Sequence, residues 1–174
     1  MQYKSLTKGF TLIEIIIGMV ALSAAFALIT SLLLPTSERG AAQIQEIRAA
    51  ELGQSMLNEI FSKAFDHNSD MAGGLVRCGE SGVSCTANLG FEGTETRATF
   101  NDVDDYHLMP VQVKDSLGNV LPRYTGFTMS ISVCNVSNYT GSCSSATTFA
   151  KLVTITITTP LGNNVVFSRF KANF

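Results

Sequence analysis

The stretch KGFTLIEIIIGMV, from Lys8 to Val20, begins a long apolar run. Glu14 lies near the start of the run, and no residue from Ile15 to Leu34 can ionise. At 1.5 Å per residue, a helix over Ile15 to Leu34 spans roughly 30 Å, the thickness of the hydrocarbon core of a bilayer. We therefore expect a transmembrane helix over residues 10–34.

A short basic segment precedes the apolar run. Residues 1–9 contain Lys4 and Lys8, and such a segment stays in the cytoplasm while the following chain is exported. The residues from Ser31 to Pro35 match the small-residue motif of a signal peptidase site poorly, so we expect the helix to be retained. The rest of the chain should then form a water-soluble domain outside the cytoplasm.

The segment KGFTLIE, from Lys8 to Glu14, resembles the processing site of type IV prepilins and pseudopilins. The resemblance implies a leader peptide over residues 1–9, removed by a prepilin peptidase that cuts between Gly9 and Phe10 and methylates the amino terminus of Phe10. It also implies an inner-membrane precursor with a periplasmic head. After processing, the chain would join other pilin subunits at the pilus assembly platform and enter an extracellular pilus.

Glu14 is the one charge in the expected membrane segment. A carboxylate at the centre of a bilayer costs about 2.5 to 3.5 kcal/mol, so such a residue needs a functional explanation. The resemblance implies that Glu14 pairs with the Phe10 amine of a neighbouring subunit and sets the register of the filament. The alternative is that Glu14 reaches the headgroups and favours the positive end of the helix dipole.

A second helical segment follows over residues 35–66. Pro35 is expected to end or kink the first segment, and Gly40 could loosen the next. Apolar residues then recur at the spacing of one helical face. We predict one long helix from about Phe10 to Phe65, bent near Pro35 or Gly40, with a stripe that packs on the head: Met56, Leu57, Ile60, Phe61, Ala64 and Phe65.

The remaining residues, 67–174, are typical of a β-rich head domain. FTMSISVCNV, from Phe127 to Val136, and KLVTITITTP, from Lys151 to Pro160, alternate with a period of two. PLGNN supplies a turn and VVFSRFKANF a returning strand. Val153, Ile155 and Ile157 should face the helix, and Thr154, Thr156 and Thr158 the other side. The predicted fold class is α+β, which is also the architecture of the type IV pilin fold.

A second resemblance is more limited. AELGQSMLNEIFSKAFD (Ala50 to Asp66), VDDYH (Val103 to His107) and PLGNNVVF near the end are similar to the MshD-type minor pilins of the mannose-sensitive haemagglutinin (MSHA) pilus. This resemblance covers most of the mature chain and implies a role in pilus assembly and surface adhesion.

Four cysteines fall as two local pairs in a domain expected outside the cytoplasm, so two disulfides are expected. Four cysteines allow three connectivities. We favour the two pairings that close short loops containing Gly and Ser. Zinc is disfavoured because the spacings differ from those of common zinc sites. The favoured pairs are Cys78 with Cys85 and Cys134 with Cys143.

The acidic segment NDVDDYH, from Asn101 to His107, is a weak calcium candidate. Asp102, Asp104 and Asp105 could offer oxygens to Ca²⁺, but the segment lacks the glycine and distal glutamate of an EF-hand loop. We favour a turn held by Asx hydrogen bonds.

No catalytic motif accompanies the two histidines, His67 and His107, so we expect no enzyme activity and no cofactor. The net charge of −2 gives no reason to expect nucleic-acid binding. The sequence therefore favours a minor pilin. A pseudopilin of a type II secretion system and a membrane-anchored binding module that never polymerises are the alternatives.

Overall fold

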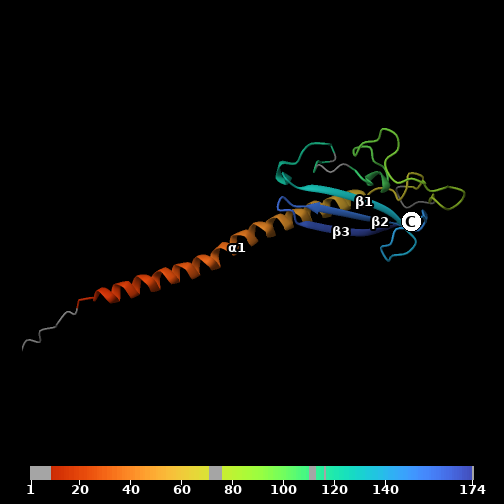
Figure 1. Cartoon of the computed structure of the whole chain (residues 1–174). Coiled ribbons are helices and arrows are strands. Elements are labelled where there is room, and N and C mark those ends of the chain that lie inside the picture. Colours follow the sequence, from red (N-terminus) through yellow and green to blue (C-terminus); the bar gives the residue numbers. More distant parts are fainter. Residues whose placement is uncertain (1–8, 71–75, 110–112, 116, 174) are drawn as a thin grey trace, which may run out of the picture. The chain divides into compact units, whose positions relative to one another are not determined.

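The computed structural model describes residues 9–70, 76–109, 113–115 and 117–173, and the side chains of residues 33–39 lie outside this description. Figure 1 shows a long helix and an antiparallel sheet, so the predicted α+β class is confirmed. The chain divides into two compact units, residues 1–43 and residues 44–174. The elements are α1 (Leu12–Phe61), the 3-10 helices η1 (Asp104–Tyr106) and η2 (Pro122–Tyr124), and the strands β1 (Thr128–Val136), β2 (Ala150–Thr158) and β3 (Asn164–Ala172).

The helix α1 contains 50 residues and is helical through both Pro35 and Gly40. One continuous helix was expected, and the backbone does not break at Pro35. A proline inside a helix removes one hydrogen bond of the ladder. The predicted bend near these residues stays a prediction.

The end of α1 differs from the prediction by one turn, because the helix ends at Phe61 instead of Phe65. The Ala64 amide donates to the Asn101 carbonyl at 3.0 Å, and the Val103 amide donates to the Ala64 carbonyl at 3.1 Å. Ala64 and Asp102 thereby form an isolated parallel bridge. The segment from Asn101 to Val103 binds the backbone groups that another helical turn would use. Helix propensity does not predict such a contact, because the segment is distant in the sequence.

The three strands form one antiparallel sheet in the order β1–β2–β3. Each strand begins and ends within about two residues of its predicted limits, and Phe174 lies outside the described residues. In the turn between β2 and β3, the Thr159 amide donates to the Asn163 carbonyl at 2.8 Å. Gly162 has a φ of 85° there, a conformation that disfavours residues with a Cβ.

The core of the head lies between the sheet and the second half of α1. The period-two prediction is confirmed, because Val153, Ile155 and Ile157 are fully buried while the alternating threonines are half-buried. The helical stripe is also confirmed, with Phe61 half-buried and its other members buried. Burial of one such aliphatic side chain contributes about 1.5 to 3 kcal/mol. The core includes Leu52, Met56 and Ile60 of α1 and Met129, Ile131 and Val133 of β1.

Gly53 allows α1 to approach the sheet closely. A Cβ at this position would lie 2.5 Å from Cδ2 and 3.0 Å from Cζ of Phe167 on β3. Such distances are shorter than a carbon–carbon contact, so only a residue without a side chain fits beneath this ring.

We predict that Gly53→Ala destabilises the head by about 1 to 3 kcal/mol, the usual cost of overpacking, although alanine favours helices over glycine. Thermal unfolding of the full-length protein in detergent micelles, followed by circular dichroism, measures the effect. The matched control is Gly40→Ala, since a Cβ there would have no described neighbour within 4 Å. A melting temperature lowered equally by both substitutions would contradict this account.

Candidate functional site

The expected processing site lies directly before the start of α1. Gly9 and Phe10 are exposed and precede the helix, and Phe10 is 80% exposed. Residues 1–8 of the expected leader, with Lys4 and Lys8, lie outside the described residues. The peptide bond between Gly9 and Phe10 is thus in a non-helical, solvent-accessible segment, as a protease requires.

Thr11 is the N-cap of α1. Its Oγ1 accepts a hydrogen bond from the Glu14 amide at 3.3 Å, and its carbonyl accepts from the amides of Glu14 and Ile15. Thr-x-x-Glu is the sequence pattern of a capping box, in which the threonine satisfies an amide that the first turn leaves free. The motif that resembles a prepilin site therefore also determines where the helix begins.

Glu14 lies in the first turn of α1 and its side chain is exposed. Its negative charge is favourable at the positive end of the helix dipole. Among the described residues, no hydrogen bond or ion pair engages its carboxylate. This carboxylate is therefore available to a partner outside the chain.

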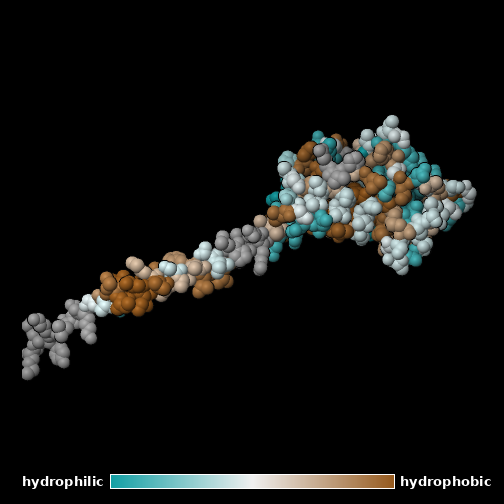
Figure 2. Space-filling view, in the orientation of Figure 1, coloured by the Kyte–Doolittle hydropathy of each residue, from teal (hydrophilic) through white to brown (hydrophobic). Residues whose placement is uncertain are grey.

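The helix from Leu12 to Leu32 is long and apolar enough to cross a membrane, with a mean hydropathy of 2.5 and none of it buried within the chain. Figure 2 shows hydrophobic residues along this part of α1. Such an exposed apolar surface is unstable in water and needs lipid or other protein chains around it.

Both disulfides have the favoured connectivity. Cys78 is bonded to Cys85 with a Cα–Cα distance of 4.6 Å, and Cys134 to Cys143 with a distance of 5.6 Å. No free cysteine is left, so the sulfurs are not zinc ligands. One N-terminal apolar helix and two disulfides are what a membrane-anchored extracytoplasmic protein has.

Lys151 forms a buried ion cluster that sequence reasoning missed. Its Nζ donates to Asp104 Oδ1 at 2.6 Å and to the Phe65 carbonyl at 2.7 Å, and lies 3.4 Å from Asp66 Oδ2. All three charged side chains are at most 1% exposed. A signal was available, because Lys151 is two residues before Val153 on the face of β2 that the alternation predicts to be buried.

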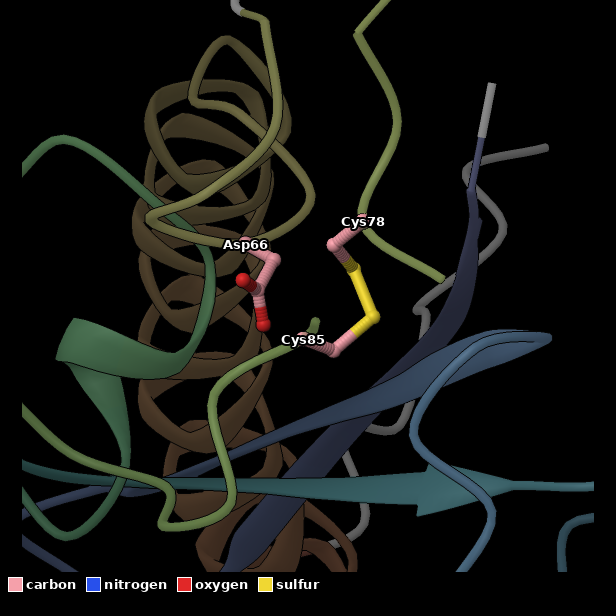
Figure 3. Close-up of side chains that lie close together, drawn as sticks. All are labelled: Asp66, Cys78 and Cys85. Carbon is pink, nitrogen blue, oxygen red and sulfur yellow. A yellow bond between two sulfur atoms is a disulfide. The ribbon is translucent and has the colours of Figure 1, made fainter. Parts of the chain in front are cut away.

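Asp66 extends this cluster to the first disulfide loop. It accepts hydrogen bonds from the Thr86 hydroxyl at 2.6 Å and from the amides of Thr86 and Asn68. Figure 3 shows the Asp66 carboxylate beside the disulfide of Cys78 and Cys85. The residues that follow α1 are thereby joined to Thr86, which directly follows Cys85 of this disulfide.

A second ion pair joins α1 to the loop before η1. Arg97 donates through Nε at 2.8 Å and through Nη2 at 2.6 Å to the two carboxylate oxygens of Glu59, and the Tyr106 hydroxyl donates to Glu59 Oε1 at 3.0 Å. Burial opposes ionisation of Glu59, but the hydrogen bonds and charge of Arg97 outweigh it and hold the pKa of Glu59 below its ordinary 4.5. This bidentate pair is of the strong kind.

The predicted Asx turn is present at Asp102. Its Oδ1 accepts from the amides of Asp104 and Asp105 at 2.9 and 3.2 Å, and Asp105 Oδ2 accepts from the amides of Asn101 and Asp102. Burial, with the hydrogen bond and charge of Asp104, raises the pKa of Asp102 to about 9. Burial likewise raises the pKa of Asp105. Asp104 is engaged by Lys151, so the three aspartates do not form one set of ligands.

The two histidines contact different residues. His107 Nδ1 accepts a hydrogen bond from the Val133 amide at 3.1 Å, which gives it a structural role beside β1. His67 Nδ1 is 3.8 Å from Glu92 Oε2, and the His67 side chain is 44% exposed.

Comparisons with models of known protein families, with curated proteins and with solved structures find no match to this chain. The architecture is pilin-like: a long N-terminal apolar helix followed by an antiparallel sheet with disulfides.

We predict that Lys151→Met destabilises the head by about 3 to 5 kcal/mol, because it leaves buried carboxylates without their cation. Urea unfolding of the full-length protein in micelles gives this value. Arg123→Met is the control, since Arg123 is 66% exposed in its pair with Glu51 and should lose at most about 1 kcal/mol. Equal losses in the two variants would refute a special role for Lys151.

The Glu59 pair predicts a pH effect. Because the folded pKa lies below 4.5, the ionised Glu59 stabilises the head fully above that pH and loses its effect as the pH falls through the lower folded value. Glu59→Gln should therefore have a lower free energy of unfolding than wild type above pH 4.5, and the difference between the two proteins should shrink as the pH drops below 4.5. Glu46→Gln, at an exposed position on α1, should run parallel to wild type. A constant gap for Glu59→Gln would show the expectation to be wrong.

Proposed function

We propose that this protein is a minor pilin of a type IV pilus, most similar to the MshD-type subunits of MSHA pili. It would be cut between Gly9 and Phe10, methylated at Phe10 and built into the filament. The role is structural, in priming assembly and in surface adhesion. We expect no catalytic step.

One observation carries the proposal. The apolar helix from Leu12 to Leu32 is wholly exposed within the chain and begins at a threonine cap, two residues after the Gly9–Phe10 bond. A simple anchor needs the apolar length but does not need a Gly-Phe junction in register with a capped first turn. The junction and the cap together favour a processed subunit whose helix packs with other helices.

Glu14 has a specific role in this proposal. Its carboxylate is exposed and without a described partner, one turn from the position that the new amine of Phe10 would occupy. In hydrocarbon the carboxylate needs a positive partner, and the Phe10 amine of a neighbouring subunit would be such a partner. The pair would set the register between helices.

The test uses full-length protein expressed in cells that assemble type IV pili. Filaments are sheared from the cell surface, and mass spectrometry searches for a peptide that begins at Phe10 and carries one methyl group. We expect this peptide in the filament fraction of wild type. For Glu14→Ala we expect a processed chain that stays in the membrane.

Glu46→Ala is the matched control, because it removes an exposed carboxylate from the same helix and should enter filaments normally. A processed wild-type chain found only in membranes would favour the pseudopilin. Normal assembly of Glu14→Ala would overturn the role of Glu14, and an uncut chain would overturn the proposal as a whole.

A further inference from the structure

Three carboxyl groups meet in the head at a place that the ion pairs of Lys151 and Arg97 do not use. Glu92 lies in the loop after the first disulfide, Asp105 lies in η1, and Asp102 lies just before η1. Each offers one oxygen, and these oxygens all lie within 4.8 Å of one another. The fold thus brings three carboxyl groups from two separate segments together.

Each of these carboxylates has one oxygen that lacks a hydrogen-bond partner among the described residues: Glu92 Oε2, Asp102 Oδ2 and Asp105 Oδ1. Asp102 and Asp105 are both 0% exposed. Their other oxygens accept backbone amides, which hold the two carboxylates in place. A buried carboxylate oxygen that accepts no hydrogen bond has lost its contacts with water and gained none in return. A proton or a cation must therefore compensate this loss.

Among the described residues, no cation donates a hydrogen bond to these three oxygens. Lys151 is engaged by Asp104 and Asp66, and Lys63 donates to the Phe100 carbonyl at 2.7 Å. His67 Nδ1 lies 3.8 Å from Glu92 Oε2, too far for a hydrogen bond, and the His67 side chain is 44% exposed. Either a proton shared among the carboxyls or an external cation must therefore balance the three groups.

We propose that Glu92, Asp102 and Asp105 bind a calcium ion. The described donors are carboxylate oxygens, which suit a hard divalent cation better than zinc. Ligand oxygens about 2.4 Å from Ca²⁺ can lie up to about 4.8 Å apart, so the spacing of these oxygens fits this ion. The set replaces Asp104 of the sequence expectation with Glu92, because Asp104 neutralises Lys151.

The bound ion would tie the loop that carries Glu92 to the turn at η1. This turn is joined to the segment just after α1 by the bridge between Ala64 and Asp102. Calcium should therefore stabilise the head against unfolding. The proposal concerns the head alone, so it stands whether or not the chain enters a pilus.

Full-length protein in detergent micelles, freed of metal with EDTA, is titrated with CaCl2 by isothermal calorimetry and melted with and without the ion. We expect one site with a Kd on the order of 10⁻⁴ to 10⁻³ M, as in other extracellular calcium modules, and a melting temperature that rises with calcium. Glu92→Gln should weaken binding at least about tenfold, since it removes one charged ligand. Glu46→Gln, at an exposed position on α1, should bind as wild type does.

The wild-type titration alone can overturn the proposal, whatever the variants do. Absence of heat, with no thermal shift beyond that of NaCl at equal ionic strength, up to about 10 mM calcium would mean that a shared proton balances the carboxyls. Binding of ZnCl2 without binding of CaCl2 would also overturn it. So would equal calcium affinities of wild type and Glu92→Gln.

Discussion

The ammonium of Lys151, a residue of β2, joins this strand to three other parts of the head. It donates to the carbonyl of Phe65 just after α1 and to the carboxylate of Asp104 at the start of η1. Through Asp66 and Thr86 it also reaches the first disulfide loop. Hydrophobic packing fixes the sheet against α1, but it does not specify how polar loops should lie. A buried charge with a defined set of acceptors specifies the positions of these loops, because each misplaced acceptor would leave that charge uncompensated.

The sequence predicted the regular elements well because their signal is periodic. Alternation over Phe127 to Val136 and Lys151 to Pro160 gave both the strands and their buried faces, and the helical stripe gave the packing face of α1. The cysteine spacing favoured the observed pairing. In each case residues close in the chain carry the information, so a local pattern is sufficient.

The loops between α1 and β1 could not be predicted in this way. Their key contacts join residues far apart in the chain, such as Lys151 with Asp66 and Arg97 with Glu59. The same reason explains the early end of α1, where the Asn101 carbonyl accepts from the Ala64 amide, and the acidic turn, where Glu92 comes close to Asp102 and Asp105. The positions of the aspartates in the sequence did not indicate that Asp104 would pair with Lys151.

The threonine cap at the start of α1 bears on how a precursor could be matured. Thr11 accepts the hydrogen bonds of the first turn from Glu14 and Ile15, and Gly9 and Phe10 lie outside the helix, so a cut between Gly9 and Phe10 leaves these hydrogen bonds in place. The helix from Leu12 onward would therefore be the same before and after the cut, and the product would lack residues 1–9 and gain a terminal amine at Phe10. The cut would then create the amine that assembly uses, and the helix would not have to refold before assembly.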